Sequence, residues 1–147
     1  MEIELGYDRL GNRLRHIGEV RIDYHRWGNR PRTVGQWSLD YDMLGNRLRH
    51  IGAAKIDYDS LGNRPRTIGQ WSLDYDMLGN RLRRIGPHEV TYDMLGNRVR
   101  TIGPLVIKYD RLGNRPRRVQ VPHGSVSLSD DLLLALFIVL YLEEEAE

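Results

Sequence analysis

The stretch YDMLGNRLRHIG at residues 41–52 decides the architecture, because it returns almost unchanged as YDMLGNRLRRIG at residues 75–86. The repeating unit is 17 residues long and occurs seven times in a chain of 147 residues. Each copy reads Tyr-Asp-x-Leu-Gly-Asn-Arg-(Leu/Pro/Val)-Arg-x-(Ile/Val), and the second copy departs from this pattern at His25 and Trp27. A fixed period of this kind predicts a tandem-repeat protein, whose fold follows from its unit.

The copies are numbered first to seventh by their tyrosines, which are Tyr7, Tyr24, Tyr41, Tyr58, Tyr75, Tyr92 and Tyr109. A longer period of 34 residues lies over the shorter one, because residues 36–49 are identical to residues 70–83. This identity indicates that a pair of copies was duplicated.

Within a copy, residues 37–41 (WSLDY) alternate apolar and polar side chains, and the matching residues of other copies do the same. Period two, with Ile, Val, Tyr and Trp enriched, predicts a strand with one buried face. The Gly-Asn pair that follows predicts a hairpin turn, either a type I turn with a left-handed glycine and a bulge or a type II′ turn. Gly52 is expected to turn the chain into the next copy.

We expect a three-residue hairpin loop at residues 43–45, because it gathers the constant positions of the repeat on one face. It places these positions in opposite pairs, namely Tyr41 and Arg47, Leu39 and Arg49, and Trp37 and Ile51. The other face then collects the variable positions, which are Ser38, Asp40, Leu48 and His50. In copies with Pro31, Pro65 or Pro116, the second strand is expected to be short, bulged or PPII-like, because proline cannot donate a ladder hydrogen bond.

Seven hairpins give about 14 strands, and an open sheet of that size would stretch about 65 Å. We therefore predict a mostly β fold over residues 1–124, with the hairpins in one long curled or closed antiparallel sheet. The alternative is a β-solenoid with one coil per repeat, which would stack arginine on arginine.

Residues 125–147 form a different segment. Ser129 is placed as a helix N-cap before Asp130 and Asp131, and residues 132–142 (LLLALFIVLYL) are an unbroken apolar run. Such a helix spans about 16 Å, too short for a bilayer. It must pack on the repeat array or on another subunit. The candidate assembly residues are Leu132, Leu133, Leu136, Phe137, Leu140 and Tyr141.

Charge is divided unevenly along the chain. Lys+Arg number 22 and Asp+Glu 20, and six of the acids lie after residue 128, which leaves a net charge of +8 on residues 1–128. A basic body predicts a polyanion partner or a body on which the acidic tail docks. Cysteine is absent and the start shows no secretory signal, so we expect a cytoplasmic protein.

The motif Tyr-Asp-x-x-Gly-Asn-Arg-Leu, followed by x-x-Ile, resembles the YD repeat of the RHS and teneurin shell proteins from Tyr7 to about Val119. In that family the repeats are β-hairpins of a long spiralling sheet that encloses a cargo or forms an adhesive body. The resemblance implies hairpins. The array is too short to build such a shell, so the hairpin is expected to transfer better than the function.

Repeated arginines beside a tyrosine column are the main binding feature. The candidate binding face consists of Tyr24, Arg30, Arg32, Tyr41, Arg47, Arg49, Tyr58, Arg64, Arg66, Tyr75, Arg81 and Arg83. Spaced guanidiniums and aromatic rings suit a nucleic acid or a sulfated or phosphorylated polymer. Alternatively, each arginine pairs with a neighbouring aspartate, such as Asp8, Asp42 or Asp76, and stacks on tyrosine as a self-neutralising ladder.

No pattern indicates catalysis, a metal or a cofactor. The five histidines, His16, His25, His50, His88 and His123, follow no ligand spacing and are interpreted as variable surface positions. We predict a non-enzymatic scaffold for self-assembly or protein–protein interaction, and a polyanion-binding module is the alternative. Residues 3–7 and 117–121 would be free sheet edges, which favour pairing between chains, and a homodimer is the first expectation.

Overall fold

The structure, a computed structural model, describes residues 1–8, 13–26, 30–43, 47–60, 64–77, 81–93, 98–111, 115–122 and 128–145. The Gly-Asn turn predicted in each copy lies outside the described residues. The elements are β1 (Glu2–Tyr7), β2 (Leu14–Ile17), β3 (Val20–Tyr24), β4 (Pro31–Val34), β5 (Trp37–Tyr41), β6 (Leu48–Ile51), β7 (Ala54–Tyr58), β8 (Pro65–Ile68), β9 (Trp71–Tyr75), β10 (Leu82–Ile85), β11 (His88–Tyr92), β12 (Val99–Ile102), β13 (Leu105–Tyr109), β14 (Pro116–Gln120) and α1 (Asp130–Glu145).

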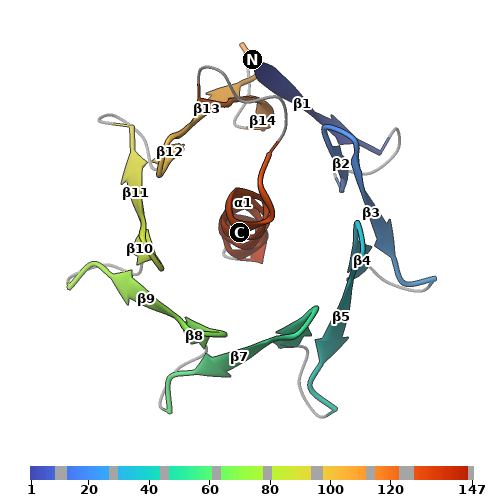
Figure 1. Cartoon of the computed structure of the whole chain (residues 1–147), viewed down its shortest axis with the longest axis vertical. Helices are drawn as coiled ribbons and strands as arrows, with labels where there is room; N and C mark the ends of the chain where they lie inside the picture. Colours follow the sequence, from blue (N-terminus) through green and yellow to red (C-terminus); the bar gives the residue numbers. More distant parts are fainter. Residues whose placement is uncertain are drawn as a thin grey trace. The chain divides into compact units, whose positions relative to one another are not determined.

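The 14 strands form one closed antiparallel barrel, in which each strand is bonded to its sequence neighbours and β1 is also bonded to β14 (Figure 1). The predicted hairpin sheet is confirmed in its closed form, together with the C-terminal helix. The solenoid alternative is wrong, because neighbouring strands run antiparallel. The chain divides into two compact units, of which one is Glu4–Leu73 and the other is Asp74–Glu147 with Met1–Ile3.

The register within a hairpin differs from the prediction. In the third copy Leu39 lies opposite Ile51 and Tyr41 opposite Leu48, with a register shift between Asp40 and Tyr41. The shift is a β-bulge, and it turns both Leu48 and Ile51 toward the core, where each is 2% exposed. The expected opposition of Tyr41 and Arg47, and of Leu39 and Arg49, is therefore wrong.

Two further parts of the predicted register need correction. Trp37 pairs with Val34 across the boundary between two hairpins, and not with Ile51. Leu48 belongs to the buried face and not to the variable one, because the bulge adds a residue to one strand and restores the apolar side chain to the core.

The β-bulge occurs in copies with and without proline, so proline is not its cause. Pro31 and Pro65 begin strands of four residues, the same length as the strand that begins at Leu48. The register shift occurs in the hairpins of both kinds of copy. Proline is tolerated because it is the first residue of its strand, beside the bulge.

Two-residue turns join successive hairpins. Their first central residue is a glycine with φ between 54° and 59°, and no other residue type among those described has positive φ. This combination defines a type II′ turn, whose twist suits antiparallel strands. The prediction that Gly52 turns the chain into the next copy is confirmed.

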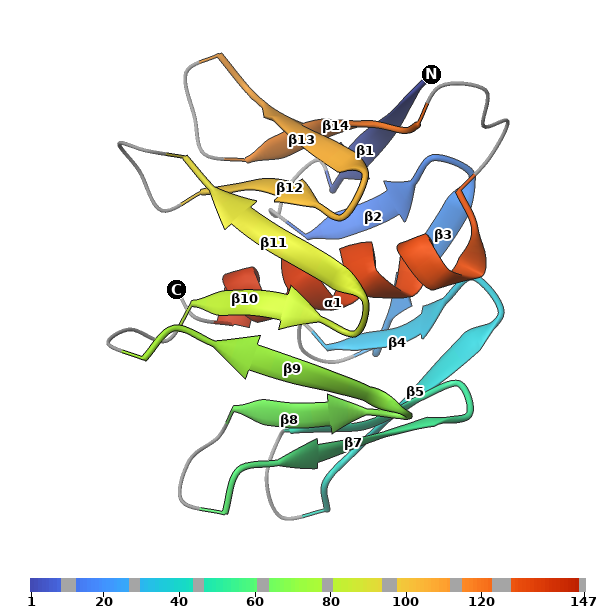
Figure 2. The ribbon, with the colours of Figure 1, turned by 60° about the vertical axis from the view of Figure 1, so that its left-hand side comes forward.

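Helix α1 is capped as predicted, because the backbone N–H of Leu132 donates a 3.2 Å hydrogen bond to Oγ of Ser129. Residues 135–139 are buried without interruption in the middle of the helix. His88 at the start of β11 contacts Asp131, and Tyr92 at its end lies near Glu143. The helix therefore runs along β11 in the same direction (Figure 2).

The residues expected to drive assembly are used within the chain. Leu133, Leu136 and Phe137 are buried, and Leu132, Leu140 and Tyr141 are half-buried. The expected sheet edges are also not free, since the N–H of Val121 donates a 2.8 Å hydrogen bond to the carbonyl of Met1. The self-assembly prediction rested on an apolar helix and on free sheet edges. In the structure the middle of the helix is buried and the edges are hydrogen-bonded within the chain.

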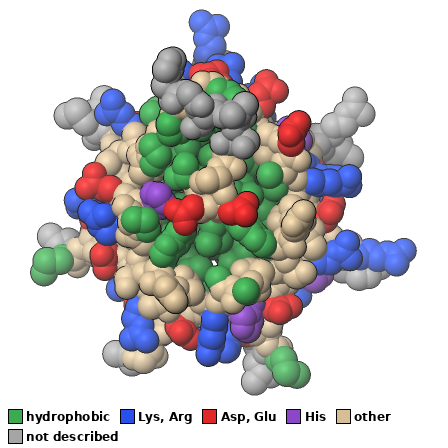
Figure 3. Space-filling model, in the orientation of Figure 1, with side chains coloured by type: hydrophobic (Ala, Val, Ile, Leu, Met, Phe, Trp, Pro, Cys, Tyr) green, Lys and Arg blue, Asp and Glu red, His purple; other side chains and the backbone are tan. Residues whose placement is uncertain are grey.

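Polar side chains stay at the surface. Among the described residues, no polar or charged residue is buried. On the face drawn in Figure 3, basic side chains lie next to acidic ones instead of forming a patch of one sign. No helix in the described part of the chain combines the length and the apolar character that crossing a membrane requires.

Candidate functional site

The base of each hairpin loop is closed by the same backbone contact. In the third copy the N–H of Asp42 donates a hydrogen bond to the carbonyl of Arg47, with an N···O distance of 2.9 Å. The equivalent bond is present in all seven copies at 2.9–3.1 Å, including the second copy, where His25 replaces the aspartate. The repeat therefore builds one backbone frame seven times.

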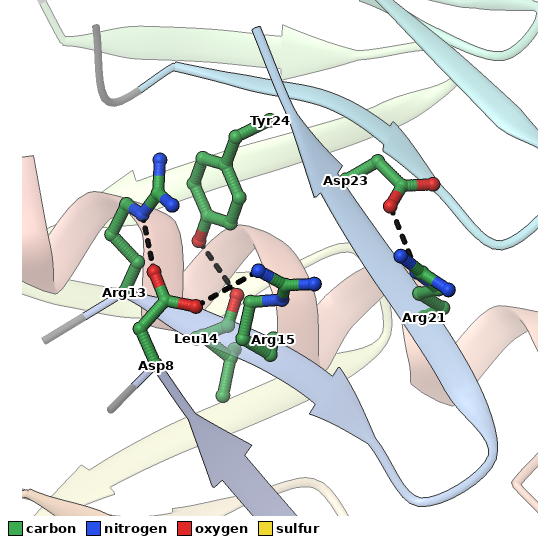
Figure 4. Close-up of polar contacts among 7 residues, drawn as sticks. All are labelled: Asp8, Arg13, Leu14, Arg15, Arg21, Asp23 and Tyr24. Carbon is green, nitrogen blue, oxygen red and sulfur yellow. Dashed lines mark hydrogen bonds and ion pairs between the residues drawn. The ribbon is translucent and has the colours of Figure 1, made fainter. Parts of the chain in front are cut away.

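An aspartate carboxylate bridges two arginines on this frame. Oδ2 of Asp42 accepts a 2.8 Å hydrogen bond from Nε of Arg47, and Oδ1 accepts a 3.0 Å bond from Nη1 of Arg49. The first copy has the same arrangement of Asp8 with Arg13 and Arg15 (Figure 4). Charge-assisted pairs of this kind fix the orientation of both guanidiniums.

The arginines lower the pKa of the bridging carboxyls. Hydrogen bonds from Arg47 are the main cause at Asp42, and hydrogen bonds from Arg83 and then Arg81 are the main causes at Asp76. At Asp8 the largest effect is burial, which raises the pKa, but the two arginines together outweigh it and the net shift is downward. These carboxylates stay charged well below neutral pH.

The arginines also join neighbouring hairpins. The backbone ladder between β6 and β7 has only two residue pairs, both near the Gly52 turn. Toward the loop end, Arg47 stacks over the ring of Tyr58 at 4.4 Å, and the hydroxyl of Tyr58 donates a 2.7 Å hydrogen bond to the carbonyl of Leu48. Tyrosine and arginine thus hold the part of the boundary that the ladder does not reach.

The same contact recurs at other hairpin boundaries. Tyrosine hydroxyls donate to a carbonyl of the preceding copy at distances from 2.5 to 2.9 Å, and arginine lies 4.4–4.6 Å from the ring centroid. The tyrosines involved are Tyr24, Tyr41, Tyr58, Tyr92 and Tyr109. The stacked arginine comes from the preceding copy, and not from the same hairpin as the predicted register required.

The ion pairs alternate with the 34-residue period. In the first, third, fifth and seventh copies the aspartate pairs with both arginines. In the fourth and sixth copies, Asp59 and Asp93 pair with the first arginine, and no ion pair of the second is found among the described residues. The second arginines of the even copies are exposed, and they are Arg32, Arg66 and Arg100.

The second copy lacks the bridging carboxylate altogether. His25 stands in its place, with its ring 6.0 Å from that of Tyr41 in an edge-to-face arrangement. Its Nε2 atom is buried and has no hydrogen-bond partner within the described part of the chain. The sequence singled out His25 as an exception to the repeat, but it did not show that the ring nitrogen is buried.

The predicted binding face is therefore engaged in the fold. Arg47, Arg49, Arg64, Arg81 and Arg83 pair with aspartates. Its tyrosines are half-buried. The contacts are those of the predicted self-neutralising arginine ladder, in which arginines pair with aspartates. The difference is that each stacked tyrosine lies under an arginine of the preceding copy. Arg32 and Arg66 are the members left exposed without an ion pair in the described ranges.

Sequence reasoning treated the histidines alike, and the structure separates them. His88 is held at 3.1 Å from Oδ2 of Asp131, where its side chain is 13% exposed. The ring of His16 lies over Gly6, whose missing side chain leaves room for it. Within the described residues, no three His, Asp or Glu side chains are grouped closely enough to hold a metal ion.

These features define a β-hairpin repeat protein whose loop bases are clamped by arginine–aspartate pairs and whose hairpins are joined by tyrosine–arginine contacts. Comparisons with protein-family models, with curated proteins and with solved structures found no match. The resemblance to YD repeats remains a prediction from the motif.

Proposed function

We propose that the chain is a non-enzymatic scaffold that binds another protein through its repeated hairpin loops. The observation that supports the proposal concerns the residue that follows the loop-base aspartate in each copy, or His25 in the second copy. This residue is exposed wherever it is described, as Arg26, Met43, Ser60, Met77 and Arg111, and both methionines are 100% exposed. Fully exposed methionines are flexible apolar side chains of the kind that protein-binding surfaces use.

A partner of different sequence fits better than a second copy of this chain. Self-association was expected from free sheet edges and from an unpartnered helix. The edges are bonded to each other, and residues 135–139 of the helix are buried. The proposal therefore predicts a monomeric mass of the free chain by light scattering.

Affinity capture from the source proteome tests the proposal. The wild-type chain is compared with the double variant Met43→Ser/Met77→Ser and with the control Ser38→Ala/Ser72→Ala, which changes exposed strand residues. We expect one or a few proteins to be captured by the wild type and the control, and at least tenfold less by the methionine variant. Equal capture by all three chains would count against the loops as the binding element.

Polyanion binding is a second candidate, favoured by one observation. Arg32, Arg66 and Arg100 are exposed, and no ion pair of theirs is found among the described residues. Apart from Arg30, the remaining arginines of the ladder pair with aspartates, which reduces the charge available to a polyanion. The salt dependence of binding separates the two candidates, because counterion release requires free cationic groups.

A further inference from the structure

Met43 and Met77 are the most exposed methionines among the described residues. Both are 100% exposed, whereas Met1 is 49% exposed. A fourth methionine, Met94, has the same position in the sixth copy and lies outside the described residues. The sequence contains no cysteine, so the thioethers of methionine are the sulfur groups of this chain. An oxidant that reacts with sulfur is therefore directed to thioethers, and exposure favours those of Met43 and Met77.

The fold does not depend on these two side chains. A fully exposed residue buries no apolar surface, so a change in its polarity costs the core nothing. The contacts beside Met43 are made by the preceding residue, Asp42, which pairs with Arg47 and Arg49. The equivalent aspartate makes the same two pairs before Met77. These ion pairs contain no sulfur, so the loop base is expected to survive oxidation of the methionine.

The duplicated pair of copies presents this methionine twice in the same frame. Residues 36–49 and 70–83 are identical in sequence. The N–H of Asp42 donates to the carbonyl of Arg47 at 2.9 Å, and that of Asp76 donates to the carbonyl of Arg81 at 3.0 Å. A chemical change at either methionine therefore has the same local surroundings and should have the same effect on its loop.

Oxidation changes the property that the loops offer to a partner. A hydroperoxide transfers its terminal oxygen to the methionine sulfur: the O–O bond breaks, an S–O bond forms, the sulfur loses two electrons, and the hydroperoxide leaves as an alcohol or as water. The thioether is flexible and apolar, whereas the sulfoxide is polar and chiral. A methionine sulfoxide reductase reverses the step with two electrons and two protons from a pair of thiols, and the oxygen leaves as water.

We propose that Met43 and Met77 form a reversible oxidation site, through which hydroperoxides switch the hairpin loops from apolar to polar. The oxidised loops release the bound protein, and reduction of the sulfoxides restores binding. The release rests on the proposed protein-binding function, whereas the modification site itself does not.

The site is tested with hydrogen peroxide on the whole purified chain. Trypsin separates the two methionines into the peptides 33–47 and 67–81, which differ at Val34 and Ile68 and therefore in mass. Fragment spectra show whether the added oxygen is on methionine or on tryptophan. We expect both methionines to react within about threefold of the rate of N-acetylmethionine amide, because nothing shields them. The urea midpoint should stay unchanged, and reductases for both sulfoxide epimers should return both peptides to their original mass.

The change in polarity is measured without a partner, by elution from a phenyl hydrophobic-interaction column. The wild type should elute earlier after peroxide treatment and return to its first position after reduction. Met43→Leu/Met77→Leu keeps apolar side chains that cannot form a sulfoxide, so its elution should shift less. Met43→Gln/Met77→Gln imitates the polar product and should elute early before any treatment.

Affinity capture from the source proteome tests the effect on binding. The reduced, oxidised and re-reduced wild-type chains are compared with Met43→Leu/Met77→Leu before and after peroxide. We expect oxidation to lower capture by the wild type about tenfold and reduction to restore it, because a polar sulfoxide replaces the apolar contact. The leucine variant should capture the same proteins in both states.

Four results would overturn the proposal. They are oxidation more than about tenfold slower than that of N-acetylmethionine amide, loss of the fold on oxidation, failure of the reductases to remove the oxygen, and equal elution shifts of the wild type and the leucine variant. Capture that oxidation leaves unchanged would exclude the release of a partner. Absence of capture by the reduced wild type would instead contradict the proposed loop function, and the oxidation site is then judged by the mass spectra and the elution alone.

Discussion

The guanidinium of Arg47 lies 4.4 Å from the ring centroid of Tyr58, and the hydroxyl of that tyrosine donates a 2.7 Å hydrogen bond to the carbonyl of Leu48. The two residues belong to successive hairpins whose backbone ladder covers two residue pairs. Their contact therefore explains why tyrosine and arginine recur with the period of the repeat: they complete the boundary between hairpins.

Substitution of Tyr58 should separate the hydrogen bond from the stacking. Tyr58→Phe keeps the ring under Arg47 and removes the hydroxyl, so we expect a loss of about 1 kcal/mol in the free energy of unfolding. Tyr58→Leu also removes the ring and should cost about 0.5–1 kcal/mol more. Urea denaturation measures both, and a phenylalanine variant as stable as the wild type would show that the hydroxyl contributes nothing to the boundary.

The bridging carboxylates should give a stability that depends on pH. Arg47 and Arg49 hold the pKa of Asp42 below the ordinary value of 3.8. A folded-state pKa below the unfolded one stabilises the protein above about pH 3.8, and this contribution is lost as the pH falls through the folded-state pKa. We expect Asp42→Asn to lower the urea midpoint at pH 7 and to lose its effect in strong acid.

Asp59→Asn is the matched control for Asp42→Asn. Among the described residues Asp59 pairs with Arg64 alone, so its replacement should lower the urea midpoint less than replacement of Asp42 does at pH 7. Equal effects of the two variants would contradict the alternation of bridged and unbridged copies.

The turn glycines should differ in their tolerance of a side chain. Gly52 and Gly69 both have φ of +59°, which costs a residue with a Cβ about 1–2 kcal/mol. A Cβ at Gly52 would also meet Cδ1 of Trp37 at 2.9 Å, whereas one at Gly69 would meet Cβ of Ala54 at 3.5 Å. Gly52→Ala is therefore expected to lower the melting temperature more than Gly69→Ala.

A double variant checks the cause of that difference. Adding Trp37→Ala to Gly52→Ala reproduces the surroundings of Gly69, so the excess cost should disappear in a double-mutant cycle. An additive result would assign the difference to something other than the contact with Trp37.

The helix should behave as part of the core. Leu136 is 0% exposed, and Leu136→Ala is expected to cost about 2–5 kcal/mol of unfolding free energy through lost burial and the cavity left behind. Leu140→Ala, at a half-buried position, should cost less. Denaturation curves that show the same small effect for both variants would mean that the helix is not a buried element in solution.

The architecture could be predicted from the sequence because each copy of the repeat contains the pattern of two strands and a turn. Alternation in WSLDY and the glycine at position 52 predicted strands and turns correctly. The register could not be read in this way, because the bulge beside Tyr41 lets Leu48 and Ile51 face the core three residues apart. A strict period of two places one of them outside.

The ladder was predictable in its chemistry but not in its connections. Arginine beside aspartate and tyrosine suggested ion pairs and stacking. Tyr58 stacks under Arg47 of the preceding copy. This pairing depends on how adjacent hairpins are placed, and the sequence of a single repeat does not contain that information. The departure at His25 was visible in the sequence. That it replaces a carboxylate that bridges two arginines could be recognised only from the geometry of Asp42 in the third copy.

The central claim is that the arginines of the ladder are committed inside the protein and are not a polyanion surface. The direct measurement is the affinity for a 20-nucleotide single-stranded oligonucleotide at several salt concentrations. If Arg32, Arg66 and Arg100 are the ladder arginines that are available, together with the exposed Arg26, Arg84 and Arg111 outside the ladder, the slope of log K against log salt should be about −4 or shallower. A slope steeper than about −5 would contradict the account, because arginines that pair with aspartates would also have to be free.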